Sequence, residues 1–116
     1  MVGCARMSDG IATVAREIPS VAVISSALSY MGTASAHVAA GCIARGDYAM
    51  AGFGRLTLAY PDLARDILRE GTLHANKICM ACSMCTQIMR QKGGTPGCVI
   101  RDKEVYGPIY KEFVKQ

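Results

Sequence analysis

The apolar positions in the first part of the chain recur with two different periods, which predicts helices alternating with strands. Residues 8–18 follow the helical spacing of i, i+3, i+4, i+7, and Pro19 is placed to stop the helix. The apolar positions of this stretch are Ile11, Val14, Ala15 and Ile18. The next run, VAVIS (21–25), is short and rich in β-branched residues. Such a run is typical of a strand that is buried on both faces.

The same alternation continues toward residue 71. A second helix is predicted from about Thr33 to Arg45, with an apolar stripe of Val38, Ala39, Cys42 and Ile43. The segment DYAMAGF (47–53) predicts a second strand. The segment after Pro61 predicts a third helix that ends at Gly71 and that turns three apolar residues inward: Leu63, Ile67 and Leu68.

Strands that alternate with helices favour right-handed βαβ units, a parallel sheet and the α/β class. Two strands alone, 21–25 and 48–53, leave both sheet edges and much apolar surface open, so the chain is interpreted as part of something larger. We expect these strands to be adjacent and to be covered by helices on one side only. The pattern changes after Gly71, which divides the chain into residues 1–71, the last βα units, and residues 72–116, a cysteine-rich segment and tail.

Composition excludes several classes of protein. The chain has 116 residues, of which 51% are hydrophobic and 19% charged, and a formal net charge of +4. These values indicate a globular chain. The net charge is small and the basic residues are interleaved with acidic ones, so the sequence does not predict a nucleic-acid partner. No apolar run approaches the roughly 18 residues that a membrane span needs, and no secretion signal is evident at the N-terminus. We therefore expect a reducing, cytoplasmic setting, in which six cysteines point to metal or redox chemistry rather than to disulfides.

Four cysteines between residues 79 and 98 are the strongest chemical signal. Cys79, Cys82 and Cys85 have CxxCxxC spacing, which lets one loop place three thiolates around one centre. Cys98 is available as a fourth ligand, because the flexible turn GGTPG (93–97) can bring it back. An iron–sulfur cluster, a structural zinc ion and unligated core cysteines are the three alternatives. Cys4 and Cys42 are expected to be ordinary residues.

Two strand ends carry a weaker signal for a phosphate. The second predicted strand runs into GFGR (52–55), where a glycine backbone and an arginine can approach phosphate oxygens. The first runs into ISSAL (24–28), and successive strand ends meet at the same edge of a parallel sheet. Two such ends converging on a phosphate are typical of the seventh and eighth loops of a (β/α)₈ barrel.

Taken together, three segments resemble the flavin-binding barrel of NADH:flavin oxidoreductases, the old yellow enzyme relatives that include dienoyl-CoA reductases. They are AGFGRLTLAYPDLARDILREG, KICMACSMCTQIMR and GCVIRDKEVYGPIY. The resemblance covers nearly the whole chain and implies the last two strands, seven and eight, of a (β/α)₈ TIM barrel, followed by a cluster-binding extension. A complete barrel needs roughly 250 residues.

The resemblance also implies cofactors and their residues. FMN would be held through its phosphate by Ser26 and Ala27 after the first strand and by Gly54 and Arg55 after the second. The family usually has glycines at the first two of these positions. A [4Fe-4S] cluster would be bound by Cys79, Cys82, Cys85 and Cys98. The catalytic side chains of the family lie on earlier strands, so none is assigned here.

Two functions follow as hypotheses. The first is a C-terminal fragment of an FMN-dependent oxidoreductase that takes hydride from NAD(P)H and passes it to an activated alkene or similar small-molecule acceptor. Such a fragment is expected to be inactive alone, and to self-associate or to pair with the missing barrel portion. The second hypothesis is a small zinc-binding interaction module without catalysis.

Overall fold

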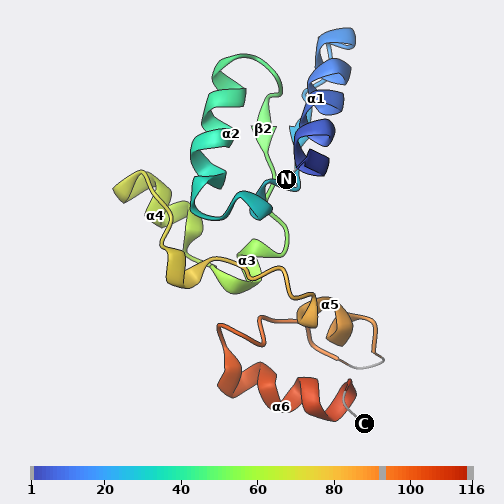
Figure 1. Cartoon of the computed structure of the whole chain (residues 1–116), viewed down its shortest axis with the longest axis vertical. Coiled ribbons are helices and arrows are strands. Elements are labelled where there is room, and N and C mark those ends of the chain that lie inside the picture. The colour runs from blue at the N-terminus through green and yellow to red at the C-terminus, as the bar shows by residue number, and fades with distance from the viewer. Residues whose placement is uncertain (1, 92–93, 115–116) are drawn as a thin grey trace.

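The first half of the chain folds around a two-stranded parallel sheet in the computed structural model, which describes residues 2–91 and 94–114 (Figure 1). The elements in order are α1 (Val2–Glu17), β1 (Ile24–Ser25), the 3₁₀ helix η1 (Leu28–Ala34), α2 (Ser35–Ala44) and β2 (Met50–Ala51). In the sheet, Ile24 pairs with Met50 and Ser25 pairs with Ala51. The predicted pair of adjacent parallel strands is confirmed. The strands are shorter than predicted, since each has a single neighbour within the described residues and so gains hydrogen bonds along one edge only.

The two faces of this sheet differ in exposure. Ser25 is fully buried, whereas the paired residues Ile24 and Met50 are 57% and 49% exposed. Val21 is also exposed, so the expectation that segment 21–25 is buried on both faces is wrong for this chain. One face is covered and the other presents apolar side chains to solvent, as the one-sided arrangement predicted.

The helices α1 and α2 bury different amounts of their apolar stripes. α1 begins earlier than predicted and ends before Pro19, and the residue that it buries is Ala12. The periodicity predicts that Val14 and Ile18 point inward, but both side chains are about half exposed. α2 packs against β2 and buries Ala39 and Cys42 as predicted.

The main core forms around two short helices, α3 (Leu56–Ala59) and α4 (Leu63–Glu70). Its buried residues are Leu56, Tyr60, Leu63, Leu73 and Ile78. Gly71 ends α4 in the left-handed conformation, with a φ of 69°, as its sequence position predicted. The predicted inward face of α4 is correct for Leu63 and wrong for Leu68, which is 86% exposed, and Asp66 is the second buried position.

The remaining elements are η2 (Ala75–Lys77), α5 (Met84–Met89) and α6 (Lys103–Phe113). α5 packs against α6, and Ile88 is fully buried between them and the returning chain. Figure 1 shows this pair at the opposite end of the molecule from α1. Leu73 and Ile78 belong to the main core, so packing continues past the predicted division at residue 71.

The molecule is less compact than a closed domain of its length. Its radius of gyration is 16.1 Å and its longest extent is 48 Å. A compact domain of this length has a radius of gyration of about 13 Å. The long shape leaves apolar faces uncovered, such as the Ile24 and Met50 face of the sheet.

Candidate phosphate and cysteine sites

The four residues predicted to hold a phosphate line one cavity. Ser26 and Ala27 follow β1, Gly54 and Arg55 follow β2, and together they border a space of about 270 Å³. The other lining residues are Ser29, Tyr30, Cys79 and Ala81. We call this space the anion cavity, because its polar side chains are hydroxyls and one guanidinium, and none of its described lining residues is acidic.

Local backbone geometry shapes the anion cavity. A methyl group added to Gly54 would meet nothing within 4 Å, so the protein leaves open space above this backbone. The amide and the hydroxyl of Thr57 both donate to the Gly54 carbonyl, at 2.9 and 2.7 Å, which holds the loop in place before α3. The backbone at Gly54 is therefore accessible to a ligand.

Ala27 occupies a conformation that favours glycine. Its φ is 66°, in the left-handed region, where a Cβ atom crowds the following carbonyl oxygen. The left-handed region costs a non-glycine residue about 1–2 kcal/mol. The structure thus explains in physical terms why glycine suits this position.

We expect Ala27→Gly to raise the free energy of unfolding by about 0.5–1 kcal/mol, because relief of strain exceeds the added entropy of the unfolded chain. Ala40→Gly, at an exposed position of α2, is the matched control and should lower stability by about 0.5–1 kcal/mol. Urea unfolding followed by circular dichroism measures both. A loss of stability in Ala27→Gly would contradict the strain at this position.

The four predicted cysteine ligands also share one cavity, which we call the cysteine cavity. It is lined by Cys79, Cys82, Cys85 and Cys98, and its volume is about 10 Å³. Cys82 is exposed and the other three are partly buried. Within residues 2–91 and 94–114, no three His, Cys, Asp or Glu side chains are arranged closely enough to hold a metal ion. The sulfurs are gathered around a cavity but not closed on one point, so the predicted convergence within ligand distance is not met in this structure.

Arg101 brings the Cys98 segment back to the CxxCxxC loop. Its Nε and Nη2 atoms donate to the Ile78 carbonyl at 3.1 and 2.7 Å, and Ile78 directly precedes Cys79. Gly97 lies against the Tyr106 ring, where an added methyl group would come within 2.0 Å of a ring atom. Gly93, at the start of the predicted GGTPG turn, lies outside the described residues. The return of Cys98 is therefore anchored by a side chain that the motif does not include.

Two of the cysteine sulfurs accept hydrogen bonds from the backbone. The Ala81 amide donates to Cys79 Sγ, and the Arg101 amide donates to Cys98 Sγ, each at 3.4 Å. Amide donors to sulfur are a means by which proteins tune metal-bound thiolates. The four thiols and these amide donors are groups of the kind that hold a metal as thiolates.

The loop between the cysteines is locally strained. Ala81 and Ser83, on either side of Cys82, both have positive φ, at 53° and 62°. Such conformations in residues other than glycine cost about 1–3 kcal/mol each and cluster at functional sites. The strained backbone distinguishes this loop from an ordinary connection, independently of its cysteine spacing.

An ionic cluster around the buried Asp66 side chain was not predicted from the sequence. Asp66 accepts hydrogen bonds from the Tyr60 hydroxyl and from Lys77 Nζ, the latter at 2.8 Å. His74 Nε2 lies 2.8 Å from a Glu70 carboxylate oxygen and 3.8 Å from one of Asp66. The cluster connects α4 to the turn that leads into Cys79. The one signal in the sequence was an aspartate on the inward face of an amphipathic helix.

This cluster gives stability a defined dependence on pH. The hydrogen bond from Lys77, followed by that from Tyr60, holds the pKa of Asp66 well below its usual range. The stabilisation is therefore fully present above the unfolded pKa of about 4 and is lost as pH falls through the lower folded value. We expect the melting temperature to fall more steeply below pH of about 4 in the wild type than in Asp66→Asn, which has no carboxylate to protonate there. Parallel curves in the two proteins would contradict this role.

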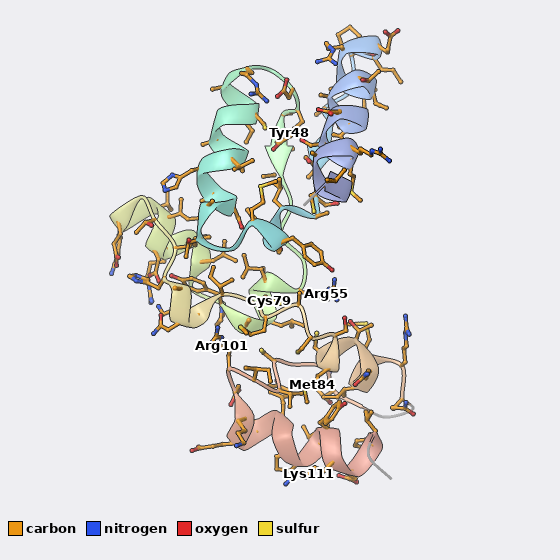
Figure 2. All side chains as sticks on the ribbon, in the orientation of Figure 1. Tyr48, Arg55, Cys79, Met84, Arg101 and Lys111 are labelled. Carbon is orange, nitrogen blue, oxygen red and sulfur yellow. The ribbon has the colours of Figure 1, made fainter. Side chains whose placement is uncertain are left out.

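The other two cysteines lie away from the cysteine cavity. Cys4 is on α1, and Cys42 is buried on α2, where Arg45 Nη2 lies 3.5 Å from its sulfur. Burial, followed by the neighbouring Cys42, raises the pKa of Tyr48 to about 12. The hydroxyls of Tyr48 and Ser25 are buried and have no hydrogen-bond partner in the described part of the chain. Figure 2 shows Tyr48 between α1 and α2, next to β2.

Comparison of the chain with protein-family models, with curated proteins and with solved structures finds no match. Across the described residues, no helix has both the length and the apolar character that crossing a membrane requires. The family named from the sequence motifs therefore remains a resemblance.

Proposed function

We propose that this chain is the C-terminal part of an FMN- and [4Fe-4S]-dependent NAD(P)H oxidoreductase of the old yellow enzyme type. The observation that carries the proposal is the adjacency of the two cavities. Ser26, Ala27, Gly54 and Arg55 line one, the four cysteines line the other, and Arg55 and Cys79 line both. Electron transfer between two cofactors requires that they lie close together. A flavin site and a cluster site that have lining residues in common would meet this requirement.

The residues of this chain would bind and orient the cofactors. Arg55 would fork onto phosphate oxygens, the Ser26 hydroxyl would donate to them, and the open backbone at Gly54 would admit them. The four cysteines would hold the cluster as thiolates. When bound, FMN supplies hydride transfer between a nicotinamide and an activated alkene or similar small molecule. We propose that substrate-binding and proton-donating groups lie on other strands of the parent barrel.

The open face of the sheet supports a missing barrel portion as partner. Ile24 and Met50 are paired in register and exposed, and the sheet has two strands within the described residues. In a barrel, these side chains would be covered by neighbouring strands. The isolated chain is therefore expected to self-associate or to be poorly soluble, and to show no NAD(P)H-dependent activity with added FMN. A stable monomer with tightly retained flavin would contradict the fragment assignment.

Anaerobic reconstitution with iron and sulfide tests the cluster. We expect a broad brown absorption band, with iron and acid-labile sulfide in equal amounts, and loss of both in Cys98→Ser. Cys42→Ser is the matched control and should keep the full band, because Cys42 lies on α2 away from the cysteine cavity. Stoichiometric zinc without iron would contradict the redox assignment.

FMN retention tests the phosphate site. In a protein that carries the whole barrel, Arg55→Ala should weaken FMN binding by about 1.5–3 kcal/mol, because a charged hydrogen bond is lost. Flavin fluorescence measures the dissociation constant. Unchanged affinity would remove Arg55 from the site.

A structural zinc module is the second candidate, and one observation favours it. The cysteine cavity has a volume of about 10 Å³. A space of this size holds about one water-sized sphere, so a single ion fits more readily than a four-iron cube. In this case the reconstituted protein would be colourless and would contain zinc. For either metal, six free cysteines support our proposal of a reducing, cytoplasmic compartment.

A further inference from the structure

Among the residues that the structure describes, Arg55 is the one charged side chain that borders both cavities. It lines the anion cavity with Ser26 and Gly54, and it lines the cysteine cavity with all four thiols. The remaining lining residues of the cysteine cavity are Leu58, Met80, Ser83, Val99 and Ile100, so among its described residues Arg55 is the only cation. Figure 2 shows Arg55 beside Cys79, which is the other residue common to both cavities.

A long-range hydrogen bond ties Arg55 to the cysteine loop. Its Nη1 atom donates to Ser83 Oγ at 3.1 Å, across 28 residues of sequence. Ser83 lies between Cys82 and Cys85 in a left-handed conformation, at the start of α5. A guanidinium has five N–H donors, so this bond leaves others available to a ligand in the anion cavity.

Both cavities, as assigned above, would hold negative charge. Four thiolates leave a bound zinc ion or iron–sulfur cluster with a net negative charge, and a phosphate ester is an anion at neutral pH. A single cation between two anions stabilises both of them. Arg55 is exposed, so solvent screens this effect and keeps it modest.

We infer that Arg55 is a counter-charge shared by the two sites, and that Ser83 is a positioning residue that holds the guanidinium between them. This inference rests on the proposed function, since it requires that one cavity bind a phosphate and the other a thiolate-bound metal. It goes beyond a phosphate contact, because it assigns Arg55 and Ser83 a role in the metal site that the cysteine spacing does not reveal.

The test measures both sites in the same variants, each made in a protein that carries the whole barrel. The cysteine cavity is followed by the midpoint potential of the reconstituted cluster and by the rate of metal release to a chelator, which applies equally to zinc. The anion cavity is followed by titration with FMN, observed through the ³¹P resonance of its phosphate. None of these readouts depends on enzymatic activity.

In Arg55→Gln we expect about tenfold weaker FMN binding and about tenfold faster metal release, together with a lower midpoint potential. The potential falls because a lost positive charge disfavours the reduced, more negative cluster. Arg55→Lys keeps the charge and should restore most of the potential, although it cannot restore bidentate binding of FMN. Ser83→Ala should shift the potential in the same direction by a smaller amount, because the guanidinium is no longer held.

Ser29→Ala is the matched control, since Ser29 lines the anion cavity and not the cysteine cavity. It should change FMN binding alone. An unchanged potential and release rate in Arg55→Gln, with FMN binding weakened, would overturn the shared role and leave the proposed function standing. A wild-type protein with the whole barrel that takes up neither metal nor FMN would overturn both.

Discussion

Leu56→Ala should lower the free energy of unfolding by about 2–5 kcal/mol, the cost of removing a large buried side chain and leaving a cavity. Leu56 has no exposed surface and packs among Tyr60, Leu63 and Leu73 in the main core. Small domains are stable by only about 5–15 kcal/mol, so this change removes a large part of the total. Chemical denaturation measured by circular dichroism provides the value.

The matched control is Leu68→Ala, which makes the same chemical change on an exposed site. Leu68 is 86% exposed on α4, and alanine is an equally good helix former. Its effect should lie within about 0.5 kcal/mol of zero. If Leu56→Ala and Leu68→Ala lowered the free energy of unfolding by similar amounts, Leu68 would be buried, as the sequence predicted, and not exposed, as in the structure.

Arg101→Ala should weaken metal binding by about tenfold to a hundredfold. The guanidinium makes two hydrogen bonds to the Ile78 carbonyl, and charged hydrogen bonds contribute about 1.5–3 kcal/mol. Without them, Cys98 is no longer held beside Cys79, and closing the intervening loop costs conformational entropy. Competition with a coloured chelator measures affinity for zinc or cobalt.

Arg69→Ala removes the same charge from the exposed end of α4 and is the matched control. It should leave metal affinity unchanged. If Arg101→Ala also leaves metal affinity unchanged, Cys98 is not held in place by this contact. A Cys98→Ser variant of the same protein then shows whether the fourth thiol takes part at all.

Several features of this protein were readable from local sequence patterns. The parallel pairing of segments 21–25 and 48–53 follows from the alternation of strands and helices, and the structure confirms it. Pro19 and Gly71 end helices as predicted, because a ring without an N–H and a residue free to adopt positive φ act on their immediate neighbours. The residues for each cavity were also identified from spacing and from strand ends, and the structure gathers each set around one space.

Burial was harder to predict because it depends on what lies opposite each face. The periodicity of α1 and of segment 21–25 marks apolar residues correctly, yet Val14 and Ile24 remain exposed. No described element covers these side chains. On α4, Leu68 is exposed and Asp66 is buried, because Tyr60 and Lys77 supply partners that make a buried carboxylate favourable.

The contacts that connect the sites were decided by tertiary structure alone. Arg55 reaches Ser83 across 28 residues, and Arg101 reaches Ile78 across 23. Hydrogen bonds over such distances leave no periodicity in the sequence, since they depend on how separate loops pack. The sequence by itself therefore indicated two sets of candidate residues, because spacing and strand ends are local features, and only the fold placed Arg55 beside both of the cavities that these residues line.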